Sequence, residues 1–134
     1  MTSLSDPLTP LVDRPVNARQ GEVWLAQLAG KNNPRDRANP HHVRPIVVVT
    51  TDLYNEFGRA FLVAPVLSCT PMRERLPTNL ILEVGDGGVT QRSVIFNTQM
   101  RAVAPWRMLR KTGMLSPAIL HALKETLRIT FDLD

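Results

Sequence analysis

The stretch of this chain best suited to chemistry is His41-His42-Val43-Arg44-Pro45, where two imidazoles and a guanidinium come directly before a β-branched run. Pro45 fixes the backbone at the entrance of that run and biases Arg44 towards extended geometry. A guanidinium stays charged and binds phosphate oxygens bidentately, and a histidine near its ordinary pKa accepts or donates a proton. An arginine placed in this way is presented at the rim of the sheet, where it could bind a phosphate group, although a solvated loop would use these residue types too.

Positive charge gathers in two segments of the chain. One is the long polar segment that ends at Arg44, and the other spans residues 101–111 and contains no acidic residue. Clustered Arg and Lys predict polyanion binding, although few aromatic residues are available for base stacking. The alternative is a basic protein whose charges are spread over its surface. The first segment contains Lys31, Arg35, Arg37 and Arg44, and the second contains Arg101, Arg107, Arg110 and Lys111.

Two hydroxyl side chains, Ser68 and Thr70, follow the end of an expected strand, where both site residues and ordinary turn residues occur. The chain has no phosphate-binding glycine loop, no zinc-protease helix motif and no pair of carboxylates at a useful spacing. Its three histidines and one cysteine do not form a ligand pattern. We therefore expect neither a metal site nor a cofactor.

The composition excludes several classes of protein. With 134 residues the chain has room for one domain, and 43% hydrophobic with 21% charged residues is enough for a core. No apolar run is long enough to span a membrane, and no secretory signal is visible. One cysteine excludes an internal disulfide, so we expect a cytoplasmic protein. The net charge is +4 with a pI near 10.0, and 13 of the 16 basic residues are arginine, which favours phosphate binding.

Short strands and one helix must position these residues. Residues 1–18 are expected to form a flexible tail, because prolines and polar residues interrupt any apolar period, and residues 19–134 to form the folded domain. Turn-forming residues predict a turn at 52–58 and a polar loop at 68–77. Alternating and β-branched runs predict strands at 22–28, 45–50, 60–67, 79–84, 93–97 and 101–104, with a further one at 109–115.

Two local features add to this pattern. Pro65 lacks a backbone N–H, so we expect its strand to lie at a sheet edge or to carry a bulge there. Ser116-Pro117 predicts a helix start, with a capping hydroxyl followed by proline at the first helical position. An apolar stripe at three- and four-residue spacing predicts an amphipathic helix of about four turns that packs on the sheet. The stripe consists of Ile119, Leu120, Leu123, Leu127 and Phe131.

The order of these segments resembles the MazF/PemK toxin family of toxin–antitoxin systems over residues 19–134. Each marker is short, but seven of them follow one another in the family's order. They are Arg19-Gln20-Gly21-Glu22-Val23-Trp24-Leu25, Arg44-Pro45-Ile46-Val47-Val48-Val49, Asp52-Leu53-Tyr54-Asn55, Val63-Ala64-Pro65-Val66, Ser93-Val94-Ile95, Gln99-Met100-Arg101-Ala102-Val103 and Leu115-Ser116-Pro117.

The resemblance implies a mainly β (α+β) fold, a small SH3-like antiparallel β-barrel with a C-terminal α-helix, usually assembled as a homodimer. It implies a metal-independent, sequence-selective endoribonuclease that cleaves single-stranded RNA by attack of a ribose 2′-hydroxyl on the adjacent phosphate. It also implies a cognate antitoxin, a peptide of which lies in the RNA groove.

The same resemblance assigns roles to individual residues. Arg44 aligns with the family's catalytic arginine, whereas Leu67 occupies the position of the catalytic threonine. Ser68 and Thr70 are therefore the candidate catalytic hydroxyls, with Ser68 suitable only where the strand ends or bulges. Thr98 replaces an acidic residue of many members, so His41 or His42 is a candidate for proton transfer. The expected substrate-binding residues are His41, His42, Arg35, Arg37, Thr98, Gln99 and Arg101.

The sequence also allows two alternative functions. Leu67 and Thr98 favour a catalytically degenerate barrel that binds RNA or an antitoxin-like peptide without cleaving. The related gyrase-poisoning branch is a poorer match, because it relies on a C-terminal Trp-Gly-Ile and this sequence ends with Phe131-Asp132-Leu133-Asp134.

Overall fold

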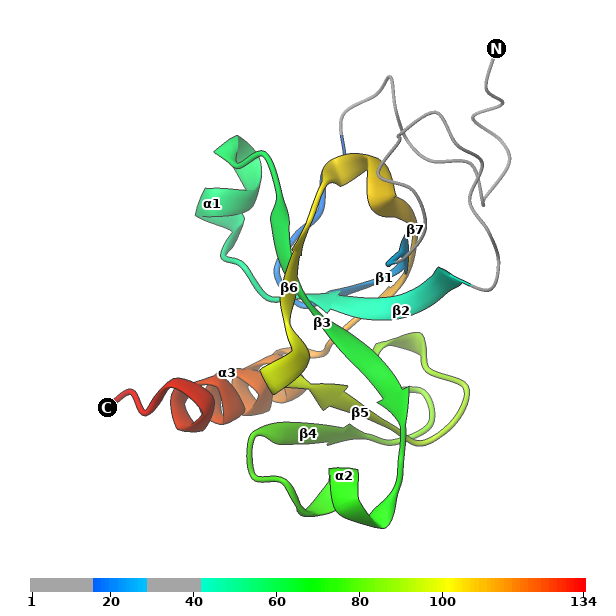
Figure 1. Ribbon diagram of the computed structural model, residues 1–134, viewed down its shortest axis with the longest axis vertical. Helices are drawn as coiled ribbons and strands as arrows, with labels where there is room; N and C mark the ends of the chain where they lie inside the picture. The colour runs from blue at the N-terminus through cyan, green and yellow to red at the C-terminus, as the bar shows by residue number, and fades with distance from the viewer. Residues whose placement is uncertain (1–15, 29–41) are drawn as a thin grey trace.

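Residues 16–28 and 42–134 are described by the computed structural model, and in this part of the chain seven strands form one sheet that three α-helices accompany (Figure 1). The strand order is β4-β5-β3-β2-β1-β7, and β6 pairs with the first half of β3; every pairing is antiparallel. The strands are β1 (Glu22–Gln27), β2 (Val43–Val48), β3 (Phe61–Ser68), β4 (Asn79–Leu82), β5 (Ser93–Phe96), β6 (Arg101–Val103) and β7 (Met108–Met114).

Both faces of the central strands are buried, which explains why their sequences are almost continuously apolar. Along β3, Val63 belongs to one hydrophobic cluster and the next residue, Ala64, to another, because successive side chains point to opposite faces. In Figure 1 the ring of β1, β2, β3, β6 and β7 lies above the layer of β4, β5 and α3 (Pro117–Phe131). The first cluster is centred on Trp24, Ile46, Phe61 and Met108, and the second on Val47, Leu82, Ile95 and Leu123.

The first described residues already contact this core. Ala18 is only 3% exposed in the first cluster, and Val16 packs against the same cluster. The sequence assigned both residues to a tail spanning residues 1–18; residues 1–15 of that segment lie outside the described part of the chain.

Each of the predicted strands is present within a few residues of its expected ends. Two segments differ from the prediction, because the turn at 52–58 is the helix α1 (Asp52–Phe57) and the loop at 68–77 contains the helix α2 (Pro71–Arg75). Thr51 and Thr70 cap these helices with their side-chain oxygens. Helices this short show no apolar period in the sequence, so only the capping residues could have indicated them.

Pro65 lies neither on an edge strand nor at a register shift between β3 and β2, where it faces Ile46. On the other side of β3, residues 61–63 pair with β6 and residues 66–68 pair with β5, and neither register includes Pro65. The missing N–H therefore falls where β3 passes from one pairing partner to the next. This local interruption tolerates proline as an edge would.

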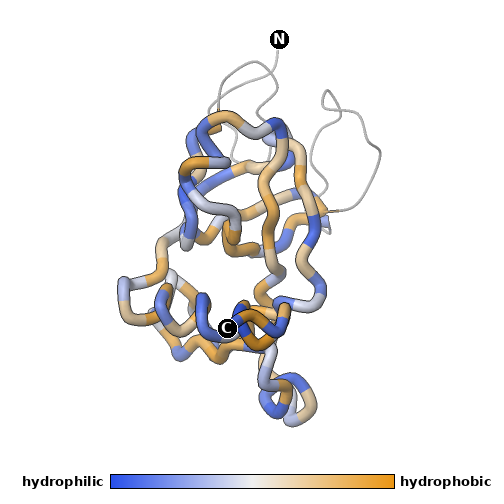
Figure 2. Tube along the Cα trace, turned by 90° about the vertical axis from the view of Figure 1, so that its left-hand side faces the viewer, coloured by the Kyte–Doolittle hydropathy of each residue, from blue (hydrophilic) through white to orange (hydrophobic). Residues whose placement is uncertain are grey.

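Helix α3 begins at the predicted cap, where the Ser116 side-chain oxygen accepts a hydrogen bond of 3.2 Å from the Ile119 amide. Leu123 is 1% exposed in the second cluster, against which Ile119, Leu120 and Leu127 also pack. Phe131 is 55% exposed, so the last residue of the predicted stripe does not contact the core. Figure 2 colours the chain trace by hydropathy and shows hydrophobic and hydrophilic residues interspersed along it. None of the helices in the described part of the chain has the length and apolar character needed to cross a membrane.

The buried carboxylate Glu22 ties the start of β1 to β7. It accepts hydrogen bonds from the Arg19 amide at 2.8 Å and from the Trp24 indole at 3.1 Å, and it forms an ion pair with Lys111 at 2.8 Å. Burial alone would raise the pKa of Glu22, but the hydrogen bonds from Lys111, Arg19 and Trp24 outweigh it and lower the pKa below its ordinary value. Lys111, which the sequence placed in a polyanion-binding cluster, is thus paired within the fold.

Candidate active site

Three of the predicted site residues, Arg44, Gln99 and Arg101, line one groove, which we call the arginine groove. It encloses about 350 Å³. Arg44 comes from β2, Gln99 from the 3₁₀ turn η3 (Asn97–Gln99) and Arg101 from the start of β6. The floor is apolar and consists of Leu28, Ile46, Val63, Pro65 and Leu67. Two cations and one amide over an apolar floor suit a nucleotide, because the cations match phosphate and the floor matches the face of a base.

Arg44 is exposed near the start of β2, and its Nη1 donates a hydrogen bond of 2.8 Å to the carbonyl of Val43. Within residues 16–28 and 42–134, no carboxylate forms an ion pair with Arg44. The guanidinium therefore keeps most of its donors for a ligand in the groove, as a phosphate clamp requires.

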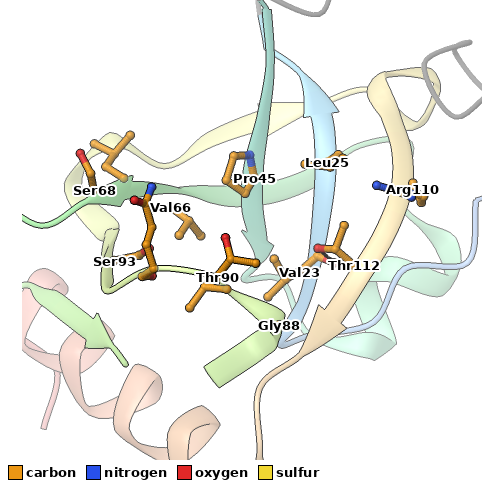
Figure 3. Close-up of a pocket in the computed structure, with 13 residues that line it drawn as sticks. Val23, Leu25, Pro45, Val66, Ser68, Gly88, Thr90, Ser93, Arg110 and Thr112 are labelled. Carbon is orange, nitrogen blue, oxygen red and sulfur yellow. Dashed lines mark hydrogen bonds between the residues drawn. The ribbon is translucent and has the colours of Figure 1, made fainter. Parts of the chain in front are cut away.

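The structure does not bring Ser68 to Arg44. Strand β3 runs to Ser68 without a register shift, with Leu67 facing Val94 and Ser68 facing Ser93 on β5. Leu67 therefore lies on the Arg44 side of the sheet, while Ser68 points to the other side. There Ser68 lines a second cavity of about 300 Å³, the Ser68 pocket, across which Figure 3 shows Arg110 of β7. The bulge that would have turned Ser68 towards Arg44 is absent from the described strand.

Thr70 and Thr98 are also outside the arginine groove. The Thr70 side-chain oxygen accepts a hydrogen bond of 3.2 Å from the Arg73 amide, so this hydroxyl caps α2. Thr98 is exposed in η3, and it does not line the cavity although its neighbour Gln99 does. Neither candidate hydroxyl from the sequence therefore faces the Arg44 guanidinium.

Of the two histidines beside Arg44, only His42 lies in the described part of the chain. It is partly buried, and its carbonyl accepts a hydrogen bond of 3.0 Å from the Leu28 amide. Its Nδ1 is buried and has no hydrogen-bond partner among residues 16–28 and 42–134. His41, Arg35 and Arg37 lie outside the described residues.

The second basic cluster of the sequence is dispersed by the fold. Arg101 lines the arginine groove, Arg110 lines the Ser68 pocket, and Arg107 is buried. Trp106 lies beside Arg107, whose guanidinium carbon is 4.5 Å from the ring centroid. The cluster therefore does not form one continuous polyanion-binding surface.

Sequence reasoning missed the apolar floor of the groove and the role of Leu28. Ile46, Val63, Pro65 and Leu67 lie on strands that the sequence predicted. Only the pairing of β2 with β3 brings these residues together in one groove. Leu28 has no chemical signal in the sequence. It reaches the groove because β1 pairs with the Arg44 end of β2.

The chain matches the family model for the PemK-like, MazF-like toxin of type II toxin–antitoxin systems over residues 19–131. It is similar to the endoribonuclease MazF9 of Mycobacterium tuberculosis (strain ATCC 25618 / H37Rv), with 31% identity over 120 residues that cover 86% of this chain and 97% of the relative. It is also similar to the endoribonuclease EndoA of Bacillus subtilis (strain 168), with 26% identity over 115 residues covering 86% and 95%.

Solved structures show the same fold. The Mycobacterium tuberculosis toxin MazF-mt6 superposes with a TM-score of 0.67 at 22% identity, covering 84% of this chain and 98% of that one. An endoribonuclease in complex with its cognate antitoxin, from a mycobacterial species, superposes with a TM-score of 0.66 at 13% identity, covering 88% and 96%.

Proposed function

The chain belongs to the family of PemK-like, MazF-like toxins of type II toxin–antitoxin systems, and we propose that it is an endoribonuclease that cleaves single-stranded RNA in the arginine groove. The observation that carries the proposal is the position of Arg44, an exposed guanidinium over an apolar floor, unpaired with any carboxylate of the described residues and close to a second arginine and an amide. The sequence relatives named above are endoribonucleases.

The proposed reaction needs no group outside the protein and the RNA. The 2′-oxygen forms a bond to the adjacent phosphorus and loses its proton, while the bond from phosphorus to the 5′-oxygen breaks and the 5′-oxygen gains a proton. The products are a 2′,3′-cyclic phosphate and a 5′-hydroxyl. Arg44 binds the non-bridging oxygens and stabilises the charge that develops on them. Arg101 adds positive potential, and Gln99 offers a donor and an acceptor to a base edge.

The proposed reaction also needs a group that accepts the proton of the 2′-hydroxyl. Among the described residues that line the groove, Arg44, Gln99 and Arg101 are the polar ones, and none of them accepts a proton near neutral pH. We propose that His42, whose carbonyl accepts a hydrogen bond from the Leu28 amide beside the start of β2, contributes to proton transfer. Replacing His41 and His42 together with alanine tests this, because an unchanged cleavage rate would exclude both.

A peptide of the cognate antitoxin is the proposed inhibitor. One structural neighbour is an endoribonuclease in complex with its cognate antitoxin, and another is a MazE–MazF assembly from Deinococcus radiodurans. An acidic, partly apolar peptide would match both the arginines and the floor of the groove. A homodimer stays a prediction, since a domain of this size has a small core of its own. Sedimentation measures it directly.

Incubation of the purified protein with a long single-stranded RNA in EDTA tests the proposed function. We expect discrete cleavage products that disappear in Arg44→Ala. Binding that weakens with salt, without cleavage in the wild type, would instead support the catalytically degenerate barrel. We retain cleavage as the function because the relatives that match by sequence are named endoribonucleases.

A further inference from the structure

Arg107 is a buried arginine close to the arginine groove, and the proposed reaction does not use it. Its side chain is 8% exposed, and within residues 16–28 and 42–134 no carboxylate forms an ion pair with it. Buried guanidinium groups normally have an acidic partner, because desolvation of a lone charge is costly. Arg107 is therefore a buried cation without an acidic partner among the described residues.

The Arg107 guanidinium holds the end of β1. Its Nη1 donates a hydrogen bond of 2.9 Å to the carbonyl of Gln27, eighty positions away in the chain. Arg101 makes the matching contact one residue further on, with a hydrogen bond of 2.7 Å from its Nη1 to the carbonyl of Leu28. The register between β1 and β7 ends at Ala26 and Met108. Beyond that pair, two arginine side chains take the place of a neighbouring strand.

The end of β1 in turn supports the end of β2 that carries Arg44. In the pairing of β1 with β2, Ala26 faces Arg44 and Gln27 faces Val43. The pairing of β2 with β3 covers only residues 46–48, so residues 43–45 have β1 as their single ladder partner. One further hydrogen bond of 3.0 Å, from the Leu28 amide to the His42 carbonyl, extends this support past the strand.

We propose that Arg107 is a positioning residue for Arg44: by holding the Gln27 carbonyl it fixes the end of β1, and through the β1–β2 ladder it fixes the backbone from which the Arg44 guanidinium reaches a phosphate. The catalytic part of this inference rests on the proposed function. The backbone part does not, because it concerns the unliganded protein.

Trp106 and Arg101 both act on the Arg107 guanidinium. The Trp106 ring lies against the guanidinium, whose central carbon is 4.5 Å from the ring centroid. Burial, and then the charge of Arg101, lower the pKa of Arg107 below its ordinary value, so this pair of arginines is held together against mutual repulsion.

The test compares Arg107→Met, which removes the donor, with Arg107→Lys, which keeps a charged donor. Arg59→Met is the matched control, because Arg59 is an exposed arginine that lines neither cavity. Amide hydrogen exchange is read at Leu28, which reports the end of β1. The amide of Val49, bonded to Leu62 at 2.8 Å at the far end of β2, serves as the internal reference. Cleavage is measured in single turnover at saturating RNA, and affinity with an RNA whose cleavage site is 2′-deoxy.

In Arg107→Met we expect Leu28 exchange to rise and the single-turnover rate to fall, each by about tenfold or more, with affinity changed by less than about threefold and Val49 exchange unchanged. Arg107→Lys is expected to recover both to within about threefold of the wild type. A wild-type rate in Arg107→Met, a loss of affinity alone, or unchanged Leu28 exchange would each overturn the proposal.

Two further outcomes remain informative. If Val49 exchange shows that Arg107→Met is unfolded, Arg107→Gln replaces it, and a wild-type cleavage rate in this variant together with raised Leu28 exchange would refute the positioning role. If the wild-type protein cleaves no RNA, the proposed function fails, and unchanged Leu28 exchange in the variants would then refute the positioning role independently.

Discussion

Arg44 and Leu67 face the same groove from neighbouring strands, and Leu67 also borders the Ser68 pocket on the other side of the sheet. The side chain nearest in sequence to the missing hydroxyl, Ser68, points away from Arg44. The groove next to the Arg44 guanidinium is therefore lined by the apolar side chain of Leu67, and no hydroxyl of the described residues lies there to meet a phosphate.

Leu67→Thr should increase cleavage, because it places a hydroxyl in the groove on the Arg44 side. We expect a rise in the single-turnover rate of about tenfold or more, since a positioned donor near the phosphate lowers the barrier by a few kcal/mol at most. Leu67→Val is the control, being the same shape as threonine without the oxygen. Equal rates in the two variants would show that a hydroxyl at this position does not act on the phosphate.

Arg44→Lys keeps the positive charge and removes the forked donor. The cleavage rate should fall by about 100-fold, because a lysine cannot bind two phosphate oxygens in the same plane. RNA affinity at low salt should fall much less, since the Coulombic attraction remains. Cleavage of a labelled oligonucleotide and filter binding measure the two effects. A rate equal to that of the wild type would mean that Arg44 contributes charge alone.

Ser68→Ala and Thr70→Ala should leave the cleavage rate within about twofold of the wild type, because neither hydroxyl faces the groove. Thr70→Ala should still lower the free energy of unfolding by about 1 kcal/mol through loss of the α2 cap. Chemical denaturation separates the two variants. A rate loss in Ser68→Ala without a loss of stability would show that Ser68 reaches the phosphate when RNA is bound.

Glu22→Gln should destabilise the fold in a pH-dependent way. Because the pKa of Glu22 is lower in the folded state than its ordinary value of 4.5, the ionised carboxylate stabilises the fold above that value. We expect the variant to lose about 1–3 kcal/mol at neutral pH, where Lys111 and the Trp24 indole lose their charged acceptor. The difference should shrink as the pH falls below 4.5 through the lowered pKa. A difference that is constant across this range in urea titrations would contradict the assignment.

The order and approximate ends of the strands could be predicted from the sequence, because alternation and β-branched runs are local signals. Ser116-Pro117 also indicated the start of α3 correctly, since a cap and a first-turn proline act within one helical turn. The short helix α1 could not be predicted from periodicity, because six residues are too few to show a face. Pro65 indicated an interruption in strand pairing, but only the pairing itself showed that β3 changes partners there.

The sequence by itself determined that Arg44 stands at the entrance of a buried strand, since proline and the β-branched residues after it act on the local backbone. It also determined that Leu67 brings no hydroxyl to the site. Only the tertiary structure decided which side chains share the groove with Arg44. Leu67 and Ser68 lie on opposite sides of the sheet because the register of β3 is unbroken. The hydrogen bond from Arg107 to the Gln27 carbonyl joins residues eighty positions apart. Such relationships arise from long-range pairing, which no short stretch of sequence specifies.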